Sequence, residues 1–156
     1  MGVLVTYRRA VVEDVPAIVR MLADDTLGAT RERVESPLPR GYYDAFAAID
    51  RDPNIELIVA ESAGRVVGTL QVTYAPGLSR QGMWRATLEA VRVAATERGK
   101  GIGAAMIQDA ITRARHRGCG LVQLTSDRSR EDARRFYERL GFIHTHVGMK
   151  LSLAPS

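Results

Sequence analysis

One short run limits the folds open to this chain: three glycines alternate with other residues in Arg98-Gly99-Lys100-Gly101-Ile102-Gly103-Ala104. Residues 84–95 before it are rich in strand formers, and residues 101–117 after it repeat apolar side chains at helical spacing. Glycines let a backbone approach a ligand closely, and the N–H groups of a helix N-terminus attract anions. We therefore expect a strand, an anion-binding loop and a helix in succession, with Arg98 and Lys100 adding positive charge.

The remaining patterns predict a mixed α/β fold (an α+β mixed sheet) with the element order β-α-α-β-β-β-α-β-α-β. No repeat or long linker divides the 156 residues, so we expect a single domain over residues 1–156. The strands are predicted at 3–8, 55–60, 66–74, 84–95, 119–125 and 147–153. The helices are predicted at 15–22, 42–51, 101–117 and 130–140, with an irregular segment at 24–41.

The predicted central strand at 84–95 changes the parity of its apolar side chains. Trp84, Ala86 and Leu88 lie at even positions, whereas Val91 and Val93 lie at odd ones. Side chains alternate between the two faces of a strand, so this change requires one extra residue or a loss of register. We expect a β-bulge near residues 89–90, a feature that leaves backbone groups unpaired and is common beside active sites.

The composition is that of a soluble globular protein, with 46% hydrophobic and 26% charged residues. Cys119 is the only cysteine, which excludes an intrachain disulfide and a zinc site built mainly from thiolates. No apolar run approaches the roughly 20 residues of a membrane helix, and the first residues lack the pattern of a secretory signal. We expect a cytoplasmic protein that binds neither a metal nor a membrane.

The charge is distributed unevenly around the net value of +4. Residues 92–156 carry 12 basic and 6 acidic side chains, whereas residues 1–91 carry 10 basic and 12 acidic ones. The C-terminal half therefore suits an anionic partner. Nucleic acid is not expected, because no stretch interleaves aromatic with basic residues and no helix-turn-helix or zinc-finger spacing occurs.

Two common phosphate-binding loops fit the glycine run poorly. A nucleoside-triphosphate loop needs Ser or Thr after its Gly-Lys pair, and here Gly101 follows Lys100. A dinucleotide-binding fold would use Gly99, Gly101 and Ala104, with Asp127 on the ribose. In that fold the glycines follow the strand at once, whereas here three residues intervene and only one more strand is predicted after Asp127.

A third comparison accounts for more of the chain. The run Arg98-x-x-Gly101-x-Gly103 resembles the (Gln/Arg)-x-x-Gly-x-(Gly/Ala) signature of the GNAT superfamily of N-acetyltransferases, which also lies between a strand and a helix. Residues 133–142 resemble the second signature of that family, a helix that carries a Tyr and ends in Gly-Phe. The element order agrees as well, so the resemblance covers nearly the whole chain. Family members often have Asn three residues before the Ala of this helix, where this chain has Arg130.

The resemblance implies acetyl-coenzyme A as co-substrate and direct attack by a primary amine through a tetrahedral intermediate. The pyrophosphate is expected on the loop amides, and the pantetheine beside residues 91–93, where an N–H near Val91 would polarise the acetyl carbonyl. Tyr137 matches the family's general acid and Arg130 is expected on a phosphate. The coenzyme-binding residues implied are Val91, Arg92, Val93, Arg98, Gly99, Lys100, Gly101, Ile102, Gly103, Ala104, Arg130 and Tyr137.

The amine must lose a proton before it attacks, which requires a general base. Glu89, at the predicted bulge, is the first candidate and acts either directly or through water. His144 and His146 are the alternatives, because the pKa of a histidine lies naturally near neutrality.

The sequence does not identify the acceptor amine or a protein partner. The acceptor is expected to enter opposite the coenzyme, beside residues 24–43, whose acidic and basic side chains are mixed. Small polyamines, aminoglycosides, amino acids and protein amines therefore all remain candidates. An alternative function of a different class is a non-catalytic acyl-coenzyme A binding or sensor module. A homodimer through the C-terminal strands is a further expectation from the family.

Overall fold

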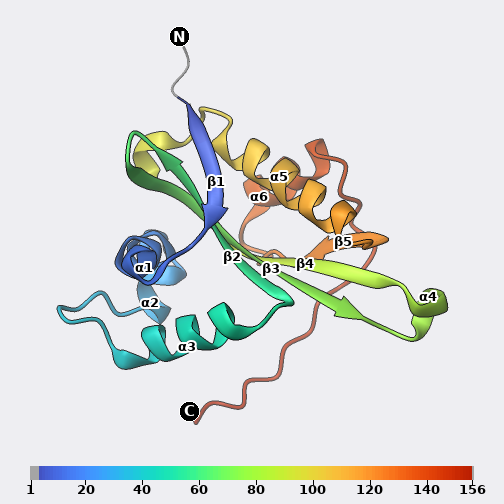
Figure 1. Ribbon diagram of the computed structural model, residues 1–156, viewed down its shortest axis with the longest axis horizontal. Helices are drawn as coiled ribbons and strands as arrows, with labels where there is room; N and C mark the ends of the chain where they lie inside the picture. The colour runs from blue at the N-terminus through green and yellow to red at the C-terminus, as the bar shows by residue number, and fades with distance from the viewer. Residues whose placement is uncertain (1–3, 156) are drawn as a thin grey trace. The chain divides into compact units, whose positions relative to one another are not determined.

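The computed structural model describes residues 4–155 and contains a five-stranded sheet in the order β1-β2-β3-β4-β5 (Figure 1). The mixed α/β class predicted from the sequence is confirmed. The strands are β1 (Val5–Arg9), β2 (Ile55–Ser62), β3 (Arg65–Pro76), β4 (Trp84–Val93) and β5 (Leu121–Leu124). The helices are η1 (Val12–Asp14), α1 (Val15–Ala23), α2 (Gly28–Arg31), α3 (Arg40–Arg51), α4 (Ser79–Gly82), η2 (Ala95–Glu97), α5 (Ile102–His116) and α6 (Glu131–Arg139).

The chain forms two compact units, one ending at Gln123 and one beginning at Leu124. In the first unit, α1 and α3 cover one face of the sheet and α5 covers the other (Figure 1). Strand β3 serves both faces because its side chains alternate. Val72 and Tyr74 point toward α5, whereas Thr69 and Gln71 point toward α1 and α3.

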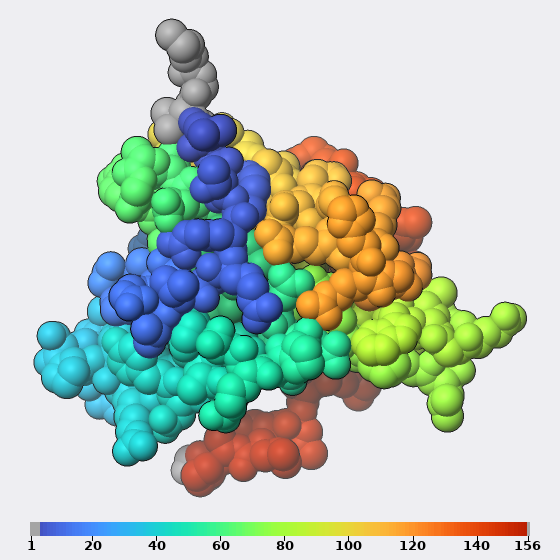
Figure 2. Space-filling view, viewed as in Figure 1, coloured from blue at the N-terminus to red at the C-terminus, as the bar shows by residue number. Residues whose placement is uncertain are grey.

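The tip of the β3–β4 hairpin extends away from these layers. Residues 77–83, yellow-green in the space-filling view, project from the rest of the first unit (Figure 2). Leu78 at this tip is 98% exposed. Between the tip and the bulge the two strands pair in regular antiparallel register, with Tyr74 opposite Ala86 and Val72 opposite Leu88.

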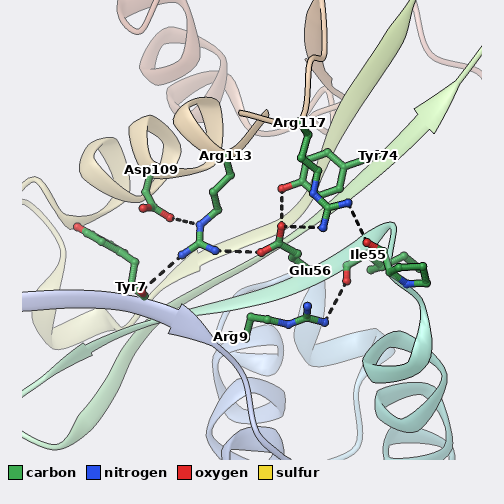
Figure 3. A network of polar contacts seen from close by, with 9 residues as sticks. Tyr7, Arg9, Ile55, Glu56, Tyr74, Asp109, Arg113 and Arg117 are labelled. Atoms are coloured by element: carbon green, nitrogen blue, oxygen red, sulfur yellow. Dashed lines mark hydrogen bonds and ion pairs between the residues drawn. The ribbon is translucent and has the colours of Figure 1, made fainter. Parts of the chain in front are cut away.

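A buried ionic cluster holds α5 on the sheet (Figure 3). The Glu56 carboxylate is 7% exposed and accepts hydrogen bonds from the Tyr74 hydroxyl and the Arg113 guanidinium, each at 2.9 Å. Arg117 donates to the same carboxylate at 3.3 Å and stacks on the Tyr74 ring at 4.1 Å. Burial, followed by the contact with Glu56, raises the pKa of Tyr74. This cluster fixes the C-terminal end of α5, the helix whose other end carries the glycine loop.

The strand predicted at 147–153 is absent from the described part of the chain, so that prediction was wrong. Residues 142–155 contain neither helix nor strand. The apolar positions that suggested a strand are exposed, with Val147 at 68% and Met149 at 93%. Alternating apolar residues form a strand only when a neighbouring strand accepts their backbone hydrogen bonds. The segment predicted as irregular also contains the short helix α2.

Candidate functional site

Strand β4 contains the predicted bulge. Gln71 of β3 lies opposite Glu89, whereas Thr69, two residues earlier, lies opposite Arg92, so β4 carries one extra residue between these pairs. Ala90 sits at this point with φ of 52°, in the left-handed region that residues other than glycine rarely adopt. The bulge explains the change of parity in the sequence: Leu88 and Val93 both face α5, although they are an odd number of positions apart, five.

The glycine loop follows this strand and ends at the N-terminus of α5. Gly99 and Gly101 have φ of 80° and 81°, and Gly101 is the N-cap of the helix. The first helical hydrogen bond runs from the Ala105 N–H to the Gly101 carbonyl at 3.1 Å. The N–H groups of the preceding turn therefore have no acceptor within the helix and are available to an anion. No atom lies within 4 Å of where a Cβ would stand at either glycine, so the loop borders open space.

The two basic side chains of this loop have acidic neighbours. The Lys100 ammonium contacts the Glu97 carboxylate at 2.8 Å, and Arg98 approaches Asp24 at 3.9 Å. The hydrogen bond from Lys100 lowers the pKa of Glu97. Glu97 was not among the residues predicted from the sequence, although its spacing of three residues from Lys100 was a visible signal. The backbone amides are thus the main positive feature of the loop, with Arg98 and Lys100 in support.

The backbone expected beside the pantetheine carries side-chain hydrogen bonds. Arg92 donates from Nη1 to the Val91 carbonyl at 2.9 Å, and Arg98 donates from Nε to the Val93 carbonyl at 3.4 Å. Arg92 also lies 3.5 Å from Asp25 and is largely buried. A ligand that runs along residues 91–93 like a strand would form its own hydrogen bonds to the Val91 and Val93 carbonyls in place of those from Arg92 and Arg98.

Glu89 is exposed and lies on the face of the sheet that α1 and α3 cover. Directly opposed residues in an antiparallel pair point to the same face, so Glu89 and Gln71 are neighbours there. The face therefore presents a carboxylate and an amide directly at the bulge.

An apolar cavity of about 150 Å³ opens between α1, α3 and the bulge. Its walls are mainly side chains of α1 and α3, including Ile18, Phe46 and Ile49. On the strand side it is lined by Leu57, Thr69, Gln71 and Ala90. A second and more open hollow is lined by Arg31, Arg33, Pro39, Gly41 and Tyr42. Tyr42 belongs to both, and its hydroxyl donates to Glu32 at 2.9 Å.

The remaining predicted residues belong to the second unit. Arg130 immediately precedes α6, and Tyr137 lies on that helix, half-buried. The Tyr137 ring packs edge-on against Phe136 and Phe142, with centroid distances of 5.1 and 5.8 Å. His144 and His146 are exposed. The structure brings the bulge, the loop and the cavity together within the first unit, and the roles of Arg130, Tyr137 and the two histidines stay predictions.

Within residues 4–155, no group of three or more His, Cys, Asp or Glu side chains is arranged to hold a metal ion. None of the helices described is long and apolar enough to cross a membrane.

Residues 18–142 match the family described as acetyltransferase (GNAT) family. This range is most of the chain, so the protein belongs to the GNAT family of acetyltransferases. The resemblance drawn from the two sequence signatures is confirmed, and with it the prediction that the chain is an acyltransferase.

The chain is also similar to individual acetyltransferases and to solved structures. An aminoalkylphosphonate N-acetyltransferase from Salmonella typhimurium is 32% identical, over 69% of each chain. A glucosamine 6-phosphate N-acetyltransferase from Trypanosoma brucei brucei is 36% identical, over 60% of this chain and 61% of its own. A solved structure described as a transcriptional regulator from Bacillus halodurans C-125 is 52% identical, covers 96% of this chain and all of its own, and superimposes with a TM-score of 0.94. A solved Trypanosoma brucei acetyltransferase is 28% identical with a TM-score of 0.77, over 96% of this chain and all of its own.

Proposed function

We propose that the protein transfers the acetyl group of acetyl-coenzyme A to a primary amine, which attacks directly through a tetrahedral intermediate. The observation that carries the proposal is the glycine loop, whose amides at the start of α5 border open space immediately after a bulged strand. We propose further that residues 1–156 act as one N-acetyltransferase domain in the cytoplasm.

The backbone of the first unit supports the assignment of the coenzyme to the glycine loop. Backbone amides from Gly99 to Ala104 would hold the pyrophosphate, because an anion is favoured at a helix N-terminus. A Cβ at Gly99 or Gly101 would occupy the space that the phosphates need, and both positions require a positive φ. Acetyl-coenzyme A, when bound, supplies an activated acyl group as a thioester. The backbone of residues 91–93 would orient it.

The reaction needs two proton transfers, one from the acceptor ammonium before attack and one to the departing sulfur. Glu89, at the bulge beside Gln71, would accept a proton from the acceptor ammonium, directly or through water. His144 and His146 are the alternatives for this step. Tyr137 would donate its hydroxyl proton to the departing sulfur, and Arg130 would contact a phosphate.

The names of the relatives support a small-molecule amine as acceptor. The two curated relatives are named for acetylating amines that carry a phosphonate or a phosphate.

A homodimer is also proposed, since Val147, Met149, Leu151 and Leu153 are exposed in a single chain.

The loop is tested by calorimetric titration of acetyl-coenzyme A against Gly101→Val. Valine at φ of 81° distorts the loop and its bulk blocks the approach of a phosphate, so affinity should fall at least tenfold. Gly118→Val is the matched control, because Gly118 has φ of 79° and lies past the other end of α5. Equal affinities in the two folded variants would contradict the coenzyme assignment.

Release of free thiol with a panel of amines separates an enzyme from a binding module. Tight binding of acetyl-coenzyme A with no thiol released by any amine would favour the non-catalytic alternative.

A further inference from the structure

None of the residues that line the cavity beside the bulge is among those proposed to hold the coenzyme, and the lining has a distinct chemistry. We propose that the acceptor is a primary amine carried on a small apolar body, a ring or a branched alkyl group, which this cavity encloses. The inference rests on the proposed acetyltransferase function and names the substrate class of that site.

The lining excludes a strongly polar acceptor body. None of the described side chains that line the cavity is charged, and aliphatic and aromatic groups of α1 and α3 form most of its wall. A sugar placed there would lose the hydration of its hydroxyl groups without gaining partners, at about 1–3 kcal/mol for each group left unpaired. An apolar body gains free energy from the same burial.

The few polar groups of the lining are already committed, with one exception. The Thr69 hydroxyl donates to the Ile58 carbonyl at 3.1 Å and is buried. The Tyr42 hydroxyl donates to Glu32 and accepts from the Arg33 N–H at 3.1 Å. Among the described residues, the Gln71 amide makes no hydrogen bond and stays available to a ligand.

The position of that amide orients the acceptor. Gln71 lies opposite Glu89 at the bulge, on the face that the cavity opens onto. An amine attached to a body in the cavity therefore meets the Gln71 amide and the Glu89 carboxylate beside Ala90. The apolar part points inward between Ile18 and Phe46, and the reactive nitrogen points toward β4.

The volume sets the size of the body. A cavity of about 150 Å³ lined by aliphatic and aromatic side chains is large enough for a benzene ring. Short arylalkylamines and branched alkylamines match this volume. An aminoglycoside exceeds it, and a linear diamine would bring a second ammonium group against an uncharged wall.

Steady-state thiol release with two groups of amines tests the inference. Benzylamine, 2-phenylethylamine and isoamylamine form the apolar group, and putrescine, 2-aminoethylphosphonate and glucosamine 6-phosphate form the polar group. We expect kcat/KM for the apolar group to exceed that for the polar group about tenfold or more. A preference for the polar group would overturn the inference while leaving the acetyltransferase function intact.

A pair of variants tests whether the preference for apolar amines arises at the cavity. Ala45 is exposed on α3 and lines the cavity, so Ala45→Phe fills it without disturbing the core. Ala47 is also exposed, lies on the opposite side of α3 and takes no part in the lining, so Ala47→Phe is the matched control. Ala45→Phe should raise KM for 2-phenylethylamine at least tenfold and Ala47→Phe should leave it unchanged; equal effects would refute the assignment.

Calorimetric binding of 2-phenylethylamine to the protein with coenzyme A gives a readout independent of turnover. Binding that Ala45→Phe abolishes and Ala47→Phe retains supports the cavity even if no amine is acetylated, in which case only the proposed reaction fails. No binding to the wild-type protein overturns the inference.

Discussion

At the scale of single residues, the candidate site concentrates unusual backbone conformations. Ala90 has φ of 52°, and Gly99 and Gly101 have φ near 80°. The glycines adopt this region at no steric cost, whereas an alanine there costs about 1–2 kcal/mol. The pairs Gln71–Glu89 and Thr69–Arg92 hold Ala90 in place from both sides. Strain that the surrounding register enforces is typical of functional sites.

Tyr137→Phe tests whether a hydroxyl protonates the departing sulfur. Phenylalanine keeps the edge-on ring contacts with Phe136 and Phe142, so α6 should stay packed. We expect kcat to fall about 10²–10⁴-fold with little change in the affinity for acetyl-coenzyme A. Tyr7→Phe, which removes a hydroxyl from β1, is the control. A loss confined to coenzyme affinity, or only a few-fold drop in kcat, would show that Tyr137 is not the acid.

At the scale of elements, ion pairs attach the helices to the sheet on both faces. Glu56 with Arg113 and Arg117 holds α5. On the other side, Arg8 of β1 binds Asp14, directly before α1, with Nη1–Oδ2 at 2.7 Å and Nη2–Oδ1 at 3.0 Å. The Val11 N–H adds a third hydrogen bond to the Asp14 carboxylate at 2.8 Å. Asp14 therefore ties the start of α1, which forms one wall of the cavity, to strand β1.

Asp14→Asn should make the stability of the protein less dependent on pH. The hydrogen bond from Arg8 holds the pKa of Asp14 below its ordinary value. A carboxylate with a lowered pKa stabilises the fold above its unfolded pKa of about 4, and this contribution disappears as the pH falls through the folded pKa. Urea unfolding should show the variant less stable by about 1–3 kcal/mol at pH 7, with the difference shrinking below pH 4.

Asp44→Asn is the control for that measurement. Asp44 pairs with Arg40 at 3.4 Å on an exposed helix surface, where ion pairs contribute little. A difference between Asp14→Asn and the wild type that stays constant from pH 7 to pH 3 would contradict the linkage.

At the scale of the whole molecule, the charge is divided along the chain. The glycine loop and α6 lie in the half that carries 12 basic and 6 acidic side chains, whereas α1, α3 and their connection lie in the slightly acidic half. The proposed coenzyme region therefore attracts anions, and the cavity region has no such bias. Attraction of this kind is screened by salt, with a Debye length of about 8–10 Å at physiological ionic strength.

Coenzyme A affinity should fall as the salt concentration rises. Arg130→Ala should weaken binding at low salt and flatten the dependence of log Kd on log salt, because one contact to a phosphate is removed. Arg40→Ala, an exposed change in the other half, should leave the slope unchanged. Equal slopes for the wild type and Arg130→Ala, measured by titration at several salt concentrations, would exclude Arg130 from the phosphates.

Local patterns in the sequence were enough to predict the five strands of the sheet, the four longer helices, the bulge and the turn at Gly99 and Gly101. Each of these depends on neighbours along the chain: side-chain parity at 84–93, helical spacing at 102–116 and the sterics of positive φ. They could be predicted without knowing what the segments pack against.

The tertiary structure decided what depends on contacts between distant segments. The pairing of Glu97 with Lys100 was visible in the local spacing, whereas the approach of Arg98 to Asp24 and the cavity between α1, α3 and Ala90 were not. The predicted strand at 147–153 failed for the same reason, because a strand requires a partner that its own residues do not specify. Sequence therefore determined the loop and the bulge, and only the packing of α1 and α3 against β4 determined the space beside them.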